Sequence, residues 1–594
     1  MVLFIGSAQG QFVEFQQIQW NKRSLQTANL RTTETLAIPF WDDFAQGIDS
    51  LKWTLEGVSF TETIGNNAPS FGMVLFNGVD QNGRPYSLQI RDQGEGDYLT
   101  SKPIDLSILS PEESQTLFLS FFWQAGGKAE FPDGADDLTL QILDPAQNWI
   151  TAWSQSGGDE LDRENFTQEI IQILPEWQHA GFQFRFFSSG RQSGPFDSWL
   201  LDYVYLNSGR STSDLFTLDR ALTQPNQVYL NSYSAYPYFL FESYQEDNWT
   251  RISNEFKNLE NRFRAMEYSI LATDSSGQQL AAINTDTPFD PVPDALERRL
   301  FDSRDFESLT PPEEETDVRF TTFLTSGDER LFEIMEGDTI WYDQVNFAVN
   351  DTVSSFFPLR DFFAYDRGQA DYAAGINQRS GQLVVRYTTP EEVYLKGISI
   401  LFTNPAQANQ AIDIQVWDQL ESRALLTKQE VIPDFRDGSQ FIYYALDTNL
   451  QVSGEFYIGF TQFSNEFLHV GLDKSHDTGG EIYYNVGGGW VQNEQVKGSL
   501  MIRPHVSPSP SLIENEIPEE SLRIYPNPVF DRLTIEGKIE SIQVFDSFGR
   551  EILLERQKTE KGEIINFGNR LPGIYVLQIS TPWCIESHRI LIRN

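Results

Sequence analysis

Short runs of alternating apolar and polar residues recur along most of the chain, separated by Gly, Asp and Pro. In the first third they are TLFLSFFWQA (116–125), DDLTLQILD (136–144), FQFRFFSS (182–189) and SWLLDYVYLN (198–207). Alternation places successive side chains on opposite faces of a strand, and closely spaced turn residues are typical of antiparallel sandwiches. The pattern predicts a jelly-roll β-sandwich over residues 35–210, in which only 166–174 is also compatible with a helix.

The pattern continues through two further regions. Residues 215–350 are less regular and predict an Ig-like β region, in which EFKNLENRFRAMEY (255–268) fits either a helical turn or a strand. Residues 360–505 again alternate clearly, in VYLKGISILFT, AIDIQVWDQ and GEFYIGFTQF among others, and predict a second β-sandwich. Residues 506–520 are rich in Pro, Ser and Glu and predict an exposed linker.

The last part of the chain, 521–594, forms a pattern of its own. About six short strands are expected, among them SIQVF, GEIINFG, LPGIYVLQIS and a terminal SHRILIRN. The segment Tyr525-Pro526-Asn527-Pro528 fits the entrance of this unit, because proline stiffens the chain and asparagine tolerates a turn. The chain is therefore predicted to be all-β and multidomain, with a small C-terminal β-sandwich.

The two ends of the chain differ in what they predict. MVLFIGSAQGQ (1–11) is interpreted as the remnant of a signal peptide, because a short apolar run precedes small residues. Residues 12–34 are polar and patternless, and a linker or pro-segment is expected there. No apolar run is long enough to predict a transmembrane segment.

Charge separates the tail from the rest. The chain of 594 residues has a net charge of −42, whereas residues 521–594 carry 10 Lys and Arg against 9 Asp and Glu. So acidic a protein lacks the basic surface that nucleic acids and anionic membranes require. Its single cysteine, Cys584, excludes an intramolecular disulfide and a cysteine-based metal site.

The tail closely resembles the type A C-terminal sorting domains of type IX secretion cargo in Bacteroidetes. The residues that carry the resemblance are Tyr525, Pro526, Asn527, Pro528, Asp546, Gly549, Gly573, Tyr575 and Arg589, in the motifs YPNP, VFDSFGRE, LPGIYVLQI and HRILIRN. The terminal segment departs from the usual lysines by using His588, Arg589 and Arg593. The resemblance implies export by a signal peptide, recognition by the type IX translocon, removal of the tail by a sortase-like protease, and an extracellular or cell-surface location.

One motif suggests catalysis. Glu160, Asp162 and Glu164 have the spacing that places three carboxylates on one face of a strand, as in retaining glycoside hydrolases with a jelly-roll fold. Gly157, Gly158 and Arg163 argue against a strand anchored on an apolar face, so a solvated acidic loop is the preferred interpretation. No catalytic residue is predicted.

A set of aspartates in the first sandwich suggests a structural calcium ion, since hard carboxylate oxygens suit calcium. The set comprises Asp42, Asp43, Asp80, Asp136, Asp137 and Asp202. Asp202 interrupts an otherwise apolar strand, and a buried carboxylate needs a partner or a cation. Region 40–207 weakly resembles MAM, laminin-G and carbohydrate-binding jelly rolls, some of which hold calcium between the opening and closing strands. The alternative is that Asp202 pairs with an arginine, with Arg185 as the candidate, or lies at a strand edge.

Exposed aromatic residues would suit a polysaccharide, because sugar rings stack on them. Trp490, in the glycine-rich loop YYNVGGGW, is the best candidate in the sequence. The sequence therefore favours a non-catalytic secreted or surface-attached protein that binds polysaccharide or a surface protein, as an adhesin or scaffold. The alternative is an exported polysaccharide hydrolase with carboxylate catalysis.

Overall fold

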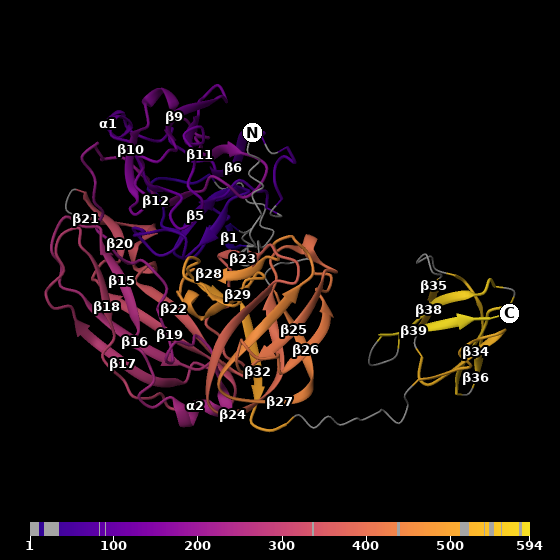
Figure 1. Ribbon diagram of the computed structural model, residues 1–594. Coiled ribbons are helices and arrows are strands. Elements are labelled where there is room, and N and C mark those ends of the chain that lie inside the picture. Colours follow the sequence, from indigo (N-terminus) through magenta and orange to yellow (C-terminus); the bar gives the residue numbers. More distant parts are fainter. Residues whose placement is uncertain are drawn as a thin grey trace, which may run out of the picture. The chain divides into compact units, whose positions relative to one another are not determined.

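The computed structural model describes residues 11–16, 35–81, 84–89, 91–335, 338–435, 440–510, 522–539, 541–545, 552–559, 561–568, 570–580 and 585–593. The fold is all-β, as predicted, and nearly every strand pairs antiparallel with its neighbours (Figure 1). The chain divides into two compact units, Met1–Pro510 and Ser511–Asn594. Among the described residues, no helix has the length and apolar character needed to cross a membrane.

The first part of unit 1 is a sandwich of two sheets. One sheet has the order β10-β7-β12-β5-β4 with β2 beside β12, and the other has the order β3-β6-β11-β8-β9. The strands of the first sheet are β2 (Phe40–Asp42), β4 (Ser59–Thr61), β5 (Met73–Phe76), β7 (Phe118–Ala125), β10 (Thr167–Gln172) and β12 (Trp199–Asn207). Those of the second are β3 (Trp53–Glu56), β6 (Gln93–Ser101), β8 (Asp137–Leu143), β9 (Trp149–Ser156) and β11 (Phe184–Arg191). Apolar side chains of both sheets form one core between them.

The middle part contains three sheets. The largest has the order β14-β22-β19-β16-β17, and smaller sheets have the orders β13-β15-β18 and β20-β21. These strands are β13 (Arg220–Leu222), β14 (Tyr236–Pro237), β15 (Ser253–Asn258), β16 (Glu267–Thr273), β17 (Gln279–Pro288), β18 (Arg298–Asp302), β19 (Thr316–Thr325), β20 (Arg330–Met335), β21 (Asp338–Asn346) and β22 (Thr352–Arg360). The described helices of unit 1 are short and lie between strands. They are α1 (Pro111–Gln115), α2 (Tyr238–Tyr244) and the 3₁₀ turns η1 (Pro175–Trp177), η2 (Phe347–Val349), η3 (Pro405–Gln407) and η4 (Gly479–Glu481).

The last part of unit 1 is built on two long strands that pair with each other, β24 and β27. Its larger sheet has the order β26-β25-β27-β24-β29-β30, with β32 also beside β24, and its smaller sheet has the order β1-β23-β28-β31. These strands are β1 (Phe12–Gln16), β23 (Tyr372–Ile376), β24 (Gln382–Leu401), β25 (Ala411–Trp417), β26 (Leu426–Val431), β27 (Phe441–Gln462), β28 (Val470–Asp473), β29 (Ile482–Asn485), β30 (Val491–Gln492), β31 (Ser499–Leu500) and β32 (Ile502–Ser507).

Several details differ from the sequence interpretation. Residues 12–16 are not a linker, because they form β1 and pair with β23 more than 350 positions away. The two segments that were also compatible with helix, 166–174 and 255–268, contain β10 and parts of β15 and β16. Strand β32 extends into the predicted linker as far as Ser507. The predicted signal remnant, apart from Gln11, lies outside the described residues.

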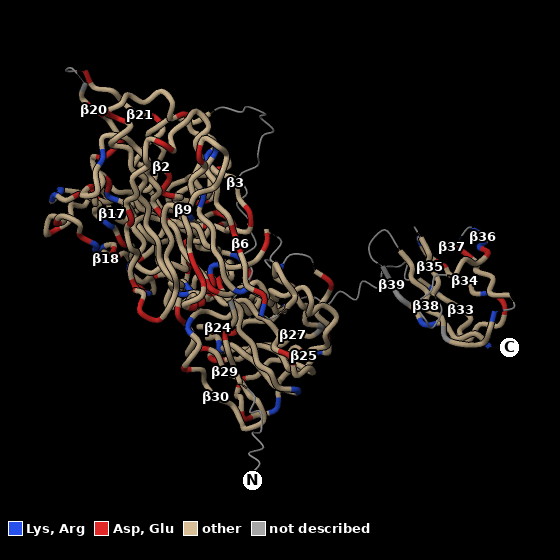
Figure 2. The backbone as a smooth tube through the Cα atoms, turned by 90° about the horizontal axis from the view of Figure 1, so that it is seen from above, with Lys and Arg blue, Asp and Glu red and all other residues tan. Residues whose placement is uncertain are grey.

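The three parts of unit 1 pack against one another through a shared core and polar contacts. One apolar cluster runs from Phe12 to Val506 and includes side chains of all three parts. The guanidinium of Arg298 donates to the Asn67 carbonyl at 2.7 Å, and the Tyr233 hydroxyl donates to the Thr388 carbonyl at 2.8 Å. Figure 2 shows acidic positions spread along much of this unit rather than confined to one segment.

Unit 2 is a small sandwich with its own apolar core. One sheet has the order β33-β34-β37-β36, and the other has the order β35-β38-β39. The strands are β33 (Arg523–Tyr525), β34 (Arg532–Glu536), β35 (Ser541–Phe545), β36 (Glu555–Thr559), β37 (Gly562–Asn566), β38 (Gly573–Ser580) and β39 (Ile585–Ile592). Alternation of buried and exposed residues in β34 and β35 reflects a strand with one face on this core.

Candidate ligand-binding site

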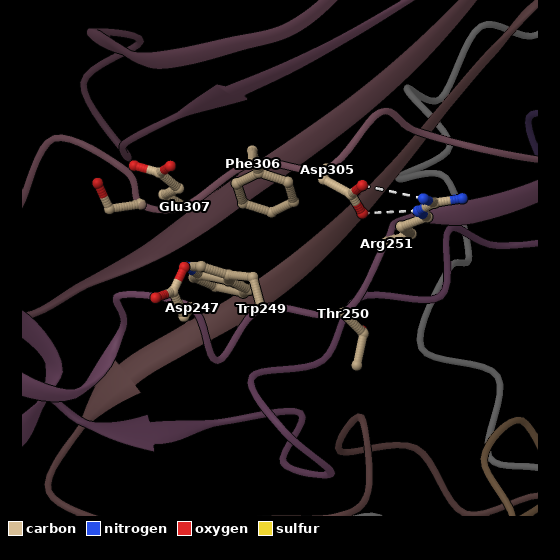
Figure 3. A pocket seen from close by; sticks show the side chains of 8 residues that line it. Asp247, Trp249, Thr250, Arg251, Asp305, Phe306 and Glu307 are labelled. Carbon is tan, nitrogen blue, oxygen red and sulfur yellow. Dashed lines mark hydrogen bonds and ion pairs between the residues drawn. The ribbon is translucent and has the colours of Figure 1, made fainter.

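An open groove of about 680 Å³ lies in the middle part of unit 1, next to the turn that follows α2. Two aromatic rings, Trp249 and Phe306, lie one above the other in it, with ring centroids 5.6 Å apart and planes inclined by 31° (Figure 3). The remaining groups that line the groove are polar, namely Asp247, Thr250, Arg251, Asp305, Glu307 and Ser308. Aromatic surface beside hydrogen-bonding groups is the composition expected of a site for a small polar ligand.

The buried side chain of Gln245 joins the two segments that form the groove. Its Oε1 accepts from the Leu309 amide at 2.8 Å, and its Nε2 donates to the Leu309 carbonyl at 3.0 Å. The indole Nε1 of Trp249 also donates to Gln245 Oε1, at 3.4 Å. The Trp249 and Phe306 segments are therefore fixed relative to each other without a ligand.

Trp249 is half-buried because one part of its ring packs on the sheet below. Its centroid lies 5.6 Å from that of Phe320 in β19 and 5.0 Å from that of Phe357 in β22. These contacts hold the indole in one orientation while part of it remains accessible from the groove. A rigid aromatic ring loses little conformational entropy when a ligand stacks on it.

An exposed ion pair lines the groove on one side. Arg251 Nε donates to Asp305 Oδ1 at 2.7 Å, and its Nη2 donates to Asp305 Oδ2 at 2.9 Å, as the dashed lines in Figure 3 show. This hydrogen bonding and the arginine charge lower the pKa of Asp305, so this carboxyl stays ionised and is not suited to donate a proton. Counting Asp247 and Glu307, three carboxylates and one guanidinium line the groove, a balance suited to neutral rather than anionic ligands.

The sequence did not point to this groove. Trp249 lies in the irregular middle region, in the segment DNWTR, and its polar neighbours were the only available signal. Its pairing with Phe306 brings together positions on opposite sides of β15, β16, β17 and β18, which local patterns do not reveal.

The catalytic motif of the sequence is a surface loop. Glu160, Asp162 and Glu164 follow β9 and are exposed. Asp162 Oδ1 accepts from the Glu164 amide at 2.8 Å, and the side chain of Asn165 donates to its Oδ2 at 3.0 Å. Hydrogen bonds from Asn165 and from the Glu164 backbone lower the pKa of Asp162. Because the segment turns instead of extending, the three carboxylates do not line one face of a strand.

Three of the six predicted calcium ligands are buried near the opening and closing strands, each with a partner. Asp42 Oδ2 accepts from the Trp53 indole at 2.7 Å, and Asp202 accepts from the amide and hydroxyl of Ser70 at 3.1–3.2 Å. Burial raises the pKa of Asp43 to about 7, with the Asp42 charge as the next cause, and burial holds that of Asp202 well above its usual value. Asp202 therefore does not pair with Arg185, which donates to Gln141 instead.

The other three predicted ligands lie elsewhere. Asp80 Oδ1 accepts from the Arg84 amide at 2.8 Å in a turn, and Asp137 Oδ1 accepts from the Ser156 hydroxyl at 2.6 Å. Asp136 lies with two residues that the sequence interpretation did not include, Asp133 and Asp197. The structure thus does not bring the six aspartates together.

Trp490 does not project freely from its glycine-rich loop. It is half-buried and packs edge-on against the buried Trp417, with ring centroids 5.4 Å apart. It therefore presents less free aromatic surface than the loop sequence suggested.

In unit 2, Asn527 links the YPNP motif to the terminal strand. Its Nδ2 donates to the Arg589 carbonyl at 2.8 Å, and its Oδ1 accepts from the Leu591 amide at 2.9 Å. Val529, two residues further along, also contacts the terminal strand, since its amide donates to the Leu591 carbonyl at 2.8 Å. The motif thus runs beside β39 and holds the end of the chain in place.

The other sorting residues occupy both sheets of this unit. The Tyr525 hydroxyl donates to Glu536 Oε1 at 2.8 Å, and the buried Tyr575 donates to the Leu571 carbonyl at 3.0 Å. Gly573 begins β38, and Arg589 lies exposed on β39. Pro526 and Pro528 flank Asn527, whereas Asp546 and Gly549 lie outside the described residues.

The sequence profile of a known family, the secretion system C-terminal sorting domain, matches residues 523–593. These residues are a type IX sorting domain. The match covers most of unit 2 and lies outside unit 1. The sorting domain indicates export to the cell surface or the extracellular space and contact with the secretion machinery.

Comparison with known proteins gives less for unit 1. No curated protein matches the chain. Solved structures with some similarity include the CBM22-1 xylan-binding domain of Paenibacillus barcinonensis Xyn10C, at 10% identity, a TM-score of 0.20, and coverage of 30% of this chain and 99% of that domain. The xylan-binding module CBM15 is 10% identical, with a TM-score of 0.17. The similarity covers 29% of this chain and 99% of that module. A putative beta-galactosidase from Bacteroides fragilis is 11% identical, with a TM-score of 0.20. The similarity covers 52% of this chain and 42% of that protein, so the chain spans less than half of it. Likeness at these TM-scores does not bear on function.

Proposed function

We propose that the exported part of this protein binds a neutral polysaccharide, as a non-catalytic adhesin or scaffold, in the groove around Trp249 and Phe306. The observation that carries the proposal is this fixed aromatic pair inside an open groove lined by charged and hydroxyl side chains. The apolar C–H faces of a sugar ring stack on aromatic rings, and its hydroxyls pair with carboxylates and a guanidinium.

The charge of the groove narrows the ligand class. Its carboxylates outnumber its single guanidinium, and the whole chain carries a charge of −42. An anionic polysaccharide would be repelled by the groove carboxylates and by the net charge of the chain, whereas a neutral polysaccharide would not. The ligand is therefore expected to be a neutral glycan, such as a xylan, glucan or mannan.

An exported polysaccharide hydrolase is the competing function. It needs two carboxyl groups across the scissile bond, one of them protonated at working pH. Asp305 does not suit the acid role because Arg251 lowers its pKa. The carboxyl groups whose pKa is raised to about 6 or above, among them Asp43, Glu130 and Asp351, do not line the groove.

A glycan panel tests the proposal with the full chain. Neutral and acidic polysaccharides are immobilised, and binding is compared for the wild type and the double variant Asp247→Asn/Glu307→Gln, while released reducing ends are measured in parallel. We expect binding to a neutral glycan, at least tenfold weaker binding by the double variant, and no reducing ends. Binding to no glycan, or equal binding by the double variant, contradicts the proposal, and release of reducing ends supports the hydrolase.

A further inference from the structure

We propose that Asp133, Asp136 and Asp197 bind a divalent cation of the calcium class at one end of the first sandwich. Asp133 and Asp136 lie in the loop that leads into β8, and Asp197 lies in the loop that leads into β12. One carboxylate oxygen of each residue lies within 4.8 Å of those of the other two. Calcium–oxygen distances are about 2.3–2.6 Å, so oxygens on one ion lie up to about 5 Å apart.

The carboxylates converge although they are removed from solvent. Asp136 is 1% exposed and Asp197 is 6% exposed. Gly190 in β11 lies against both, because a Cβ atom there would be 3.3 Å from Asp136 Oδ1 and 3.3 Å from Asp197 Oδ2. These two oxygens therefore point to the same small space beside the β11 backbone.

The environment of Asp136 Oδ1 is the observation that points to a bound ligand. Asp136 Oδ2 accepts from the Asp133 amide at 2.8 Å, but Oδ1 is buried and has no hydrogen-bond partner in the described structure. A buried carboxylate oxygen without a donor costs free energy, which a cation bound there would offset. Burial, followed by the Asp197 charge, raises the pKa of Asp136 to about 6, as expected for acids crowded together.

The protein supplies little positive charge at this place. Arg191 Nη2 lies 3.4 Å from Asp133 Oδ2, and the two side chains are 33% and 72% exposed, so this ion pair is weak. The Arg191 amide also donates to Asp197 Oδ2, at 3.2 Å. One guanidinium thus faces three carboxylates, and the exposed Asp133 leaves a route for an ion to enter.

The chemistry of the site favours calcium over other metals. All three side chains offer hard oxygen ligands, and the described residues place no histidine in the cluster. Calcium accepts irregular oxygen geometry, whereas magnesium requires a near-octahedral set and retains its water. A bound ion would tie the loop before β8 to the loop before β12, away from the buried Asp42, Asp43 and Asp202.

The test is calcium titration of the full chain after treatment with chelator and dialysis, followed by calorimetry and thermal unfolding. We expect calcium to bind and to raise the melting temperature by several degrees. Asp136→Asn and Asp133→Asn should each weaken binding at least tenfold and remove the shift. Asp137→Asn is the matched control, because this neighbouring carboxylate accepts from Ser156 and should leave both unchanged.

Two outcomes overturn the proposal. One is a wild-type chain without calcium binding or a thermal shift, and the other is binding that survives in Asp133→Asn and Asp136→Asn as it does in Asp137→Asn. Asp133 is exposed, so its variant is expected to fold even where Asp136→Asn does not. Far-UV circular dichroism of each variant without calcium checks folding separately from binding.

Discussion

The side-chain amide of Asn350 donates a hydrogen bond to Asp43 Oδ2 at 3.0 Å, although the two residues are 307 positions apart. The same nitrogen donates to Asp219 Oδ2 at 2.9 Å, and the Tyr203 hydroxyl donates to that oxygen at 2.5 Å. All four side chains are buried. A polar cluster therefore joins the first sandwich to the middle part of unit 1.

Asn350→Ala tests how much this cluster stabilises unit 1. The variant removes the amide from two buried carboxyl groups and leaves a cavity, so we expect the free energy of unfolding to fall by about 1–3 kcal/mol. Urea unfolding followed by tryptophan fluorescence measures the change. The exposed Asn449 in β27 is the control, and Asn449→Ala should change stability by less than about 0.5 kcal/mol. Equal stability of the two variants would show that the cluster contributes little.

Asp351 makes the stability of this part depend on pH. Burial, followed by the charge of Asp328, raises its pKa to about 9 in the folded chain. An unfolded aspartate titrates near pH 4 (about 3.9), so between these values the folded state binds more protons than the unfolded state. The free energy of unfolding contributed by this group therefore falls as the pH rises from about 4 to about 9.

Asp351→Asn is expected to remove that dependence, because asparagine resembles the protonated acid. At pH 8 the variant should be more stable than the wild type by at least about 1.4 kcal/mol, the equivalent of one pKa unit. Towards pH 4 the two proteins should become equally stable. Urea unfolding at a series of pH values gives both curves, and curves that stay parallel throughout would refute the assignment.

Asn527 is expected to control the order of the terminal strand. Asn527→Ala loses both hydrogen bonds to β39, whereas Asn527→Asp retains the oxygen that accepts from Leu591. Hydrogen exchange at the Leu591 amide should therefore be fastest in the alanine variant and intermediate in the aspartate variant. If the alanine variant exchanges at the wild-type rate, the motif does not hold the strand. Because the strand belongs to the sorting domain, we expect export to decrease in the same order.

Strands of seven or more residues that are rich in apolar and aromatic side chains could be predicted from the sequence. β7, β8 and β12 begin and end within two residues of the predicted segments, because each apolar run is bounded by turn residues. β1 was missed since its five residues gain their pairing only from β23, which local patterns do not reveal.

The candidate sites were less predictable for the same reason. Asp202 was correctly singled out as a carboxyl in a buried strand, but its partner, Ser70, lies 132 positions away. Asp133 and Asp197 lie in loops and meet only when β8 and β12 are in place. The sequence does not distinguish Trp249 from the other tryptophans, because its partner Phe306 lies in a distant segment.

The most direct test of the central claim is calorimetric titration of the best neutral glycan from the panel into the full chain, with Phe306→Ala and Trp490→Ala beside the wild type. Phe306 lies in the groove, and Trp490 is the aromatic residue that the sequence favoured. Our account predicts that Phe306→Ala weakens binding at least tenfold and that Trp490→Ala stays within twofold of the wild type. Loss of binding in Trp490→Ala with full binding in Phe306→Ala would contradict it.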